Sequence, residues 1–369
     1  MRLSAKEMQV AVRIVLRASV AMACAAILTV RAEPYLAVAS GQQCVACHVN
    51  PTGGGLRNAV GLAYAQNVLP AWPMPAANAW TGRLGEHVRL GGDLREQWTR
   101  TEVPGQPTQQ QWALDHARLY ADVEAIPSRL GLYFDQQLAP GSSRAQEAYV
   151  RLADSSGRWR LKGGQFYLPF GWRLEDDSTF VRQVSGINMN APDTGVELGF
   201  ESPTLSAQLA LTNGVANTGT GSGSQVTAQA VWVQSAWRVG AAASRTNAAA
   251  GDRSMAALFG GVRTGPLAWL AELDWVRDDG IPEGQRTRLV ALGEVNWAVV
   301  KGHNLKLTAE YFDPDRDVRE DHKTRLGFVW EFTPWPYVQL RAGVRNWDGI
   351  PQIPVDNRRL IFFELHGFL

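Results

Sequence analysis

The sequence lacks the long apolar runs that membrane-spanning helices require. Although 45% of its 369 residues are hydrophobic, no run reaches the length of about 18 apolar residues that marks a transmembrane helix. Charge is also sparse, at 19% of residues, and it is nearly balanced, with 36 Lys and Arg against 35 Asp and Glu. A helical membrane protein is therefore excluded, and no basic patch predicts a nucleic-acid partner.

Cysteine is equally scarce, with three residues in the chain, whereas tryptophan and glycine are abundant at 14 and 36 residues. A disordered chain would lack both the tryptophans and the apolar content. The mean hydropathy is only −0.18, so apolar residues are finely interleaved with polar ones. This pattern is typical of a sheet that is apolar on one face, of which a membrane-spanning barrel is the extreme case.

Residues 1–32 are predicted to be an export signal. Basic residues precede the apolar run Ala18–Val30, and Val30-Arg31-Ala32 places small residues at the −3 and −1 positions of a cleavage site. The run is too short to cross a bilayer as a helix. After removal of this segment the chain keeps two cysteines, Cys44 and Cys47.

The strongest chemical motif is Cys44-Val45-Ala46-Cys47-His48, which has the Cys-x-x-Cys-His spacing of c-type haem attachment. Two thiols at this spacing can each form a thioether with a vinyl group of one haem, and the following His can bind the iron as the proximal axial ligand. The alternatives are a disulfide or redox pair and half of a zinc site. No thioredoxin-like βαβ pattern and no second Cys/His pair accompany the motif.

The motif lies in a Gly- and Pro-rich segment, residues 33–80, which we predict to be a monohaem cytochrome c-like plug domain. The run Asn50-Pro51-Thr52-Gly53-Gly54-Gly55 predicts a turn whose glycines let the backbone approach a flat ring closely. Met74 is a candidate distal ligand, or equally a side chain that fills an apolar gap. Tyr64 and His87 are weaker candidates.

Period-two alternation from residue 86 onward predicts an all-β fold, a transmembrane barrel of about 16 antiparallel strands in residues 81–369. The expected strands lie near 86–100, 111–125, 129–138, 145–153, 158–168, 193–202, 205–212, 225–234, 236–246, 253–263, 266–277, 285–298, 303–313, 322–333, 336–346 and 358–369. Seven tight turns alternate with eight longer loops, as in an even-stranded barrel with both termini on the periplasmic side. Tryptophans near strand ends fit interfacial girdles. The alternative is a soluble β-sandwich or a large lipocalin-like protein.

Two of the long loops contain residues of chemical interest. The loop over 169–192 is the longest and could fold inward as a constriction. The loop over 313–322 is dense in carboxylates, which could hold a hard cation or form a solvated face interleaved with Arg.

The signal, the Cys44–His48 motif with its glycine turn, and the barrel together resemble the fused outer-membrane cytochrome–porins. Gly164–Gly171 and Asp193–Leu198 also resemble phosphate-selective porins of the O/P type. The first resemblance implies one haem c on Cys44 and Cys47 with His48 as axial ligand. It also implies electron transfer at the cell surface, notably oxidation of ferrous iron.

We therefore expect an outer-membrane protein, embedded in lipid, that exchanges electrons between an extracellular donor or acceptor and a periplasmic cytochrome or other carrier. The haem segment is expected to enter from the periplasmic side. Two alternatives remain: a porin for small anions with an accessory haem module, and a sheath for a separate multihaem cytochrome.

Overall fold

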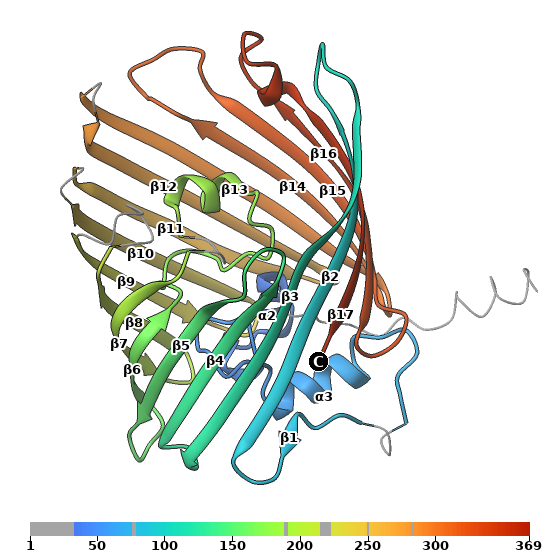
Figure 1. Ribbon diagram of the computed structural model, residues 1–369, viewed down its shortest axis with the longest axis vertical. Helices are drawn as coiled ribbons and strands as arrows, with labels where there is room; N and C mark the ends of the chain where they lie inside the picture. Colours follow the sequence, from blue (N-terminus) through green and yellow to red (C-terminus); the bar gives the residue numbers. More distant parts are fainter. Residues whose placement is uncertain (1–32, 76–78, 188–190, 215–222, 249–250, 282–283) are drawn as a thin grey trace, which may run out of the picture.

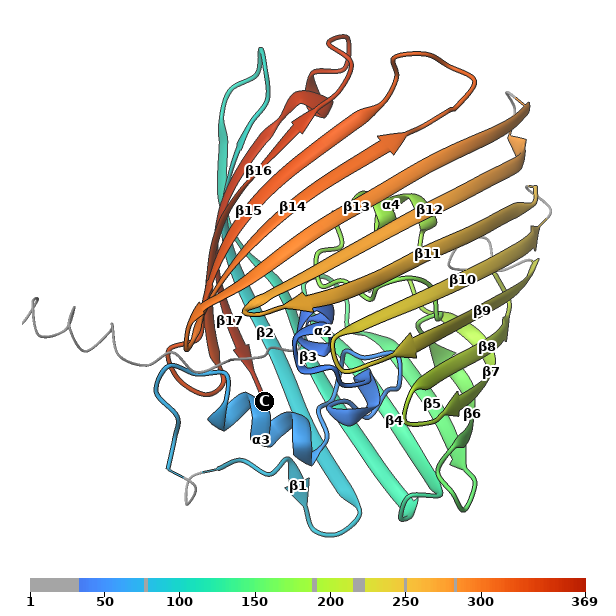
Figure 2. The same cartoon turned by 180° about the vertical axis from the view of Figure 1, so that it is seen from behind.

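The computed structural model describes residues 33–75, 79–187, 191–214, 223–248, 251–281 and 284–369, so the predicted export signal lies outside the described residues. In these residues sixteen antiparallel strands form a closed barrel (Figures 1 and 2). Closure is made by the pairing of the last strand with the first long one, in which Phe363 lies opposite Trp98. The predicted barrel is confirmed.

The barrel strands are β2 (Val88–Glu102), β3 (Gln109–Ile126), β4 (Leu130–Ala139), β5 (Arg144–Ala153), β6 (Trp159–Phe166), β7 (Asp193–Glu201), β8 (Leu205–Thr212), β9 (Gly223–Val233), β10 (Trp237–Ala248), β11 (Arg253–Thr264), β12 (Leu267–Ile281), β13 (Gly284–Val300), β14 (His303–Asp313), β15 (Lys323–Phe332), β16 (Val338–Asp348) and β17 (Arg359–Phe368). A two-residue strand, β1 (Arg83–Leu84), pairs with β2. A 3-10 turn, η3 (Pro354–Asn357), lies between β16 and β17.

Every predicted strand has one observed counterpart. Short turns alternate with longer connections around most of the barrel, but the longer loop predicted between β12 and β13 is not observed, since only residues 282–283 separate these two strands. The largest difference is at residues 278–284, where the sequence predicts a loop. There β12 and β13 instead extend their pairing outward, with Asp278 opposite Arg286 and Ile281 opposite Gly284.

The two faces of the wall differ in polarity because successive side chains of a strand point to opposite sides. Apolar side chains such as Leu119, Leu258 and Leu307 are exposed on the outer surface. Charged and polar side chains such as Glu147, Lys162 and Glu272 are buried inside the barrel. An apolar exterior around a polar interior is the pattern of a barrel that crosses lipid.

Exposed tryptophans gather at the end of the barrel that carries the short turns. They lie within a few residues of those turns and comprise Trp159, Trp232, Trp237, Trp269, Trp297 and Trp335. An aromatic girdle of this kind is typical of a membrane interface. β2 begins and β17 ends at this same end, because the number of strands is even.

Residues 33–75 form a plug that lies largely within this end of the barrel. The plug contains α2 (Pro34–Ser40), the 3-10 turn η1 (Cys44–Ala46) and α3 (Ala59–Asn67). Figures 1 and 2 show α2 inside the wall, where it contacts β11 and β12, and α3 beside the C-terminus. Within the described residues, no helix has the length and apolarity needed to cross a membrane.

The connection between β6 and β7 also folds into the lumen, as the sequence suggested for this loop. We call residues 167–187 the inner loop; it contains α4 (Phe180–Ser185). Arg182 pairs with Glu272 of β12, and the Phe180 amide donates to Glu310 of β14 at 2.6 Å. The inner loop therefore crosses the interior from β6 to the opposite wall.

Candidate functional site

The predicted haem-attachment residues lie on one short helical turn inside the barrel. The amides of Cys47 and His48 both donate to the carbonyl of Cys44, at 3.1 and 3.0 Å. This turn places the two cysteines three residues apart along one turn of helix. Both cysteines are free thiols in the structure.

A tight hairpin then returns the chain past His48. Val49 donates to Leu56, Asn58 donates to Cys47, and His48 lies opposite Arg57 in an antiparallel bridge. The hairpin contains Gly53, Gly54 and Gly55, whose φ values are +86, +72 and +60° respectively. This left-handed region of backbone conformation favours glycine. The predicted turn is confirmed, but its glycines approach protein: a Cβ at Gly55 would lie 2.2 Å from the hydroxyl of Tyr133.

Helix α3 packs directly on the motif. The Asn58 side chain caps it by accepting from the amides of Val60 and Gly61, at 3.0 Å each. Asn58 also donates to the carbonyls of Val45 and Ala46. A Cβ at Gly61 would lie 2.1 Å from the carbonyl oxygen of Cys47, so only glycine permits this contact.

Cys44, Cys47 and His48 line a common cavity of about 420 Å³, which we call the motif cavity. This volume is within the range of about 300–1,000 Å³ usual for small-molecule and cofactor sites. Its apolar lining comes from the plug, the inner loop and the barrel wall, and includes Leu36, Val60, Ala65, Trp172, Val231, Val233 and Phe259. The cavity therefore exists only when plug and barrel are assembled together.

The electrostatics of the motif favour neutral groups. Burial lowers the pKa of His48 to about 3, and the positive charges of Arg57 and Arg173 add to this effect. The imidazole is therefore uncharged at neutral pH, and its buried Nδ1 has no hydrogen-bond partner among the described residues. Burial also raises the pKa of both thiols. The negative charge of a Cys44 thiolate nearby raises the pKa of Cys47 further.

The plug is fixed to the inner wall by buried polar contacts on two opposite sides. On one side, the fully buried Asn50 donates to Glu147 of β5 and accepts from Lys162 of β6, each at 3.0 Å. On the other side, Glu33 pairs with Lys306 of β14, and the Tyr35 hydroxyl donates to Glu331 of β15 at 3.0 Å. The motif therefore has a defined position in the lumen.

A second cavity of about 690 Å³ occupies the lumen beside the plug, and we call it the lumen cavity. Its lining includes Arg144, Asp177 and Arg358 beside the long loops as well as His48 in the plug. The residues that line both cavities are Glu33, His48, Gly54, Arg57, Leu69 and Arg173. These shared residues form the boundary between the motif cavity and the polar lumen cavity.

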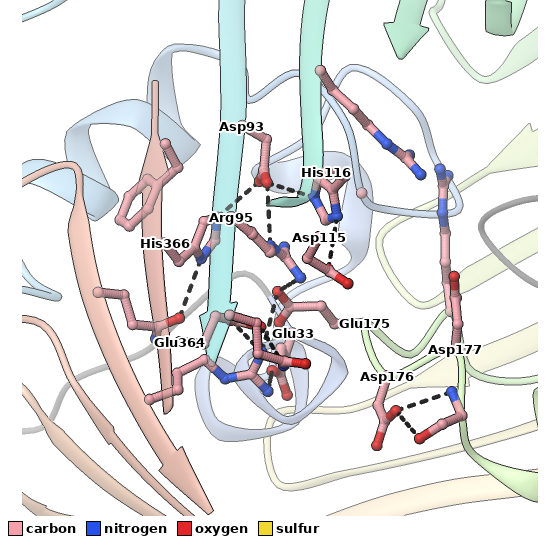
Figure 3. A pocket seen from close by; sticks show the side chains of 18 of the residues that line it. Glu33, Asp93, Arg95, Asp115, His116, Glu175, Asp176, Asp177, Glu364 and His366 are labelled. Atoms are coloured by element: carbon pink, nitrogen blue, oxygen red, sulfur yellow. Dashed lines mark hydrogen bonds and ion pairs between the residues drawn. The ribbon is translucent and has the colours of Figure 1, made fainter. Parts of the chain in front are cut away.

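Charged side chains of the lumen cavity form a connected network (Figure 3). Asp93 contacts the Nε2 atoms of His116 and His366 at 2.7 and 2.9 Å and accepts from Arg95 at 3.2 Å. Glu175 of the inner loop pairs in turn with Arg95. The network links the inner loop to the barrel wall directly above the plug.

Some candidates from the sequence are not brought to the motif. Met74 is not among the residues that line the motif cavity, whereas Tyr64 is. His87 lies in the turn between β1 and β2. Among the described residues no group of three His, Cys, Asp or Glu side chains is arranged to hold a metal ion, and this applies to the acidic loop over 313–322 as well.

Sequence reasoning missed the three arginines of the motif cavity, Arg57, Arg173 and Arg238. Arg57 stands nine residues after the motif with no distinguishing spacing, and the other two come from the inner loop and β10. Only the inward fold of the inner loop and the barrel register bring them to the cysteines. No signal in the sequence could have identified them.

Comparison with known proteins supports the fold alone. No protein-family model matches the chain, and no curated protein matches it. Solved structures with a similar fold include an anion-selective porin from Comamonas acidovorans (TM-score 0.62, 9% identity, covering 76% of this chain and 99% of that one). Another is OmpT of Vibrio cholerae (TM-score 0.60, 10% identity, covering 77% of this chain and 100% of that one). A third is the outer membrane channel DcaP of Acinetobacter baumannii (TM-score 0.56, 12% identity, covering 76% of this chain and 97% of that one). The chain thus shares the sixteen-strand barrel of outer-membrane porins.

Proposed function

We propose that this protein is an outer-membrane electron-transfer protein that carries one c-type haem inside its barrel. Cys44 and Cys47 attach the haem covalently, and His48 binds its iron. The protein links an extracellular donor or acceptor, such as ferrous iron, to a periplasmic cytochrome or other carrier. The apolar outer wall contacts membrane lipid, and the end with the plug and the tryptophan girdle faces the periplasm.

The observation that carries the proposal is that both cysteines and His48 line one mainly apolar cavity. The residues present fit haem c in their chemistry. Each thiol can add across one vinyl group, so that a C–S bond forms, the proton moves to the neighbouring carbon, and no oxidant is needed. The uncharged imidazole of His48 offers the lone pair that iron requires.

A bound haem would supply reversible one-electron transfer. The residues of the chain supply position and surroundings. Asn58 fixes the turn that holds the cysteines, and Asn50 fixes the hairpin against β5 and β6. Trp172 and Phe259 cover the cavity from the inner loop and the wall, which limits the access of water. The lumen cavity, whose lining includes Arg144 and Arg358 near the long loops, also reaches His48.

The first test is covalent haem. Purified wild-type protein should carry one haem that resists extraction with acid and organic solvent, and the Cys44→Ser/Cys47→Ser variant should carry none. Gln43→Ala is the matched control, since Gln43 binds the carbonyl of Ser202 and is no part of the attachment chemistry. Wild-type protein without covalent haem would contradict the proposal.

The second test is electron flow. Proteoliposomes that carry the protein should reduce an enclosed acceptor when ferrous iron is added outside, and the double-serine variant should not. Equal rates in the two preparations, or none in the wild type with its haem in place, would exclude the conduit.

A second candidate function is a porin for small anions with an accessory haem. The observation that favours it is the set of eight arginines around the lumen cavity, namely Arg57, Arg95, Arg118, Arg144, Arg173, Arg341, Arg345 and Arg358. Anion-selective conductance across planar bilayers in protein that lacks haem would support this candidate. A sheath for a separate cytochrome fits less well, because the plug and the inner loop both cross the lumen.

A further inference from the structure

Arg57 is a buried cation without a counter-ion. It is 8% exposed, it lines both cavities, and its guanidinium lies over the ring of Phe368 at 4.7 Å. Among the described residues no carboxylate lies within ion-pair distance of it. A buried charge is costly unless an anion or several hydrogen bonds compensate it.

The carboxylates whose charges act most strongly on Arg57 are already engaged by other groups. Asp93 and Glu175 are the acidic side chains whose charges act on Arg57. Asp93 is held by Arg95, His116 and His366, as Figure 3 shows. Glu175 pairs with Arg95 and with Arg341. Arg57 therefore lacks a partner in the protein that could neutralise it directly.

The other two arginines of the motif cavity are compensated. Arg173 pairs with Glu147 at 3.4 Å and donates to the carbonyl of Gly53. Arg238 donates to the carbonyls of Ala37 and Gln42, which ties the plug to β10. Of the three guanidiniums, only that of Arg57 faces the cavity without such a role.

We propose that Arg57 binds a carboxylate of the ligand in the motif cavity, and that this carboxylate is a propionate of the bound haem. The inference rests on the proposed function. Phe368 positions the guanidinium, and the cation would offset the negative charge of the propionate. The pair favours the reduced form, which has one positive charge fewer, and so raises the reduction potential.

The test compares Arg57→Gln, Arg57→Lys and Arg160→Gln in full-length protein by spectroelectrochemical titration. Arg160 lies on the inner face of β6 and lines neither cavity, so Arg160→Gln controls for the loss of one positive charge. We expect Arg57→Gln to lower the ratio of reduced to oxidised haem at fixed potential about tenfold, which is about 59 mV for a one-electron couple. Arg57→Lys and Arg160→Gln should stay close to the wild type. A loss of covalent haem in Arg57→Gln that Arg57→Lys restores would support the pairing equally.

The pairing is overturned if Arg57→Gln matches Arg160→Gln, or if Arg57→Lys is as defective as Arg57→Gln, since the role would then be packing. A wild-type potential that varies with phosphate concentration would assign Arg57 to free anions of the lumen instead, which also overturns it. Failure of the proposed function can be distinguished from failure of the Arg57 pairing, because in the former case the wild-type protein itself would carry no covalent haem.

Discussion

At the scale of single residues, the motif depends on contacts that one added atom would prevent. Gly61 lets α3 rest on the carbonyl of Cys47, and Asn58 joins the same helix to Val45 and Ala46. Close-packed interiors tolerate even one additional methyl group poorly. Residue 61 therefore affects the cysteines although it has no chemistry of its own.

Gly61→Ala is expected to loosen the packing between α3 and the motif by about 1–3 kcal/mol, because the new methyl group overlaps the Cys47 carbonyl. The opened state of the plug should be populated about 5- to 150-fold above the wild type, measured as the rate of limited proteolysis within residues 33–75. Gly163→Ala is the control, since a Cβ there meets no atom within 4 Å. Equal cleavage rates in the two variants would refute the role of Gly61.

The sequence could single out Cys44, Cys47 and His48 as candidates because the proposed attachment chemistry depends on spacing within five residues. It could not reveal Arg57, Arg173 or Gly61 as partners of the motif. Their contacts depend on how the plug, the inner loop and the barrel wall meet, and these segments lie far apart in the chain.

At the scale of elements, strands were the most predictable part, since an outward apolar and inward polar face imposes period two on each of them. The plug helices were less visible. Helix α2 has only seven residues and α3 nine, and both are stabilised by packing inside the barrel rather than by helical periodicity. The inner loop was predictable as long and inward-folding, but its ion pairs were not.

The docking of the inner loop should depend on pH through Asp176. Burial would raise the pKa of Asp176, but Arg345, Arg325 and the Ser178 hydrogen bonds outweigh burial and hold the pKa below its ordinary value. A carboxylate with a depressed pKa stabilises the fold above its unfolded pKa of about 3.9, and this contribution is lost as the pH falls toward the folded pKa. The loop should therefore remain docked at pH 5–7 and loosen below about pH 4.

Hydrogen exchange of α4 between pH 7 and pH 2.5 would measure this loosening. Asp176→Asn should weaken docking at pH 7 by about 1–3 kcal/mol and reduce the acid dependence, of which the neighbouring Glu175, paired with Arg95 and Arg341, keeps a share. Asp317→Asn, at an exposed carboxylate of another long loop, should change neither. Unaltered protection of α4 in Asp176→Asn would show that the loop is held by other contacts.

At the scale of the whole molecule, plug and barrel share one core. The apolar side chains of the plug, among them Tyr35, Leu36 and Val49, belong to the same buried cluster as Phe259 and Leu270 of the wall. The Gly- and Pro-rich segment 33–80 suggested a domain that makes sense only around a cofactor. The structure shows a different partner, because the barrel interior supplies much of the surface that so short a segment lacks.

Deletion of residues 33–80 is expected to leave the barrel intact and to increase its conductance by a factor of several. The plug occupies the end with the short turns, so its loss should open the lumen there. The wall charges beneath it stay compensated, since Lys162 pairs with Glu197 at 2.8 Å and Lys306 with Glu331 at 3.6 Å. Planar-bilayer recordings would measure the conductance, and heat-modifiable migration on a gel would show whether the barrel is folded. The full chain with Cys44→Ser, which keeps the plug, should conduct like the wild type. If the shortened chain fails to form a heat-modifiable barrel, the plug is required for the fold of the wall itself.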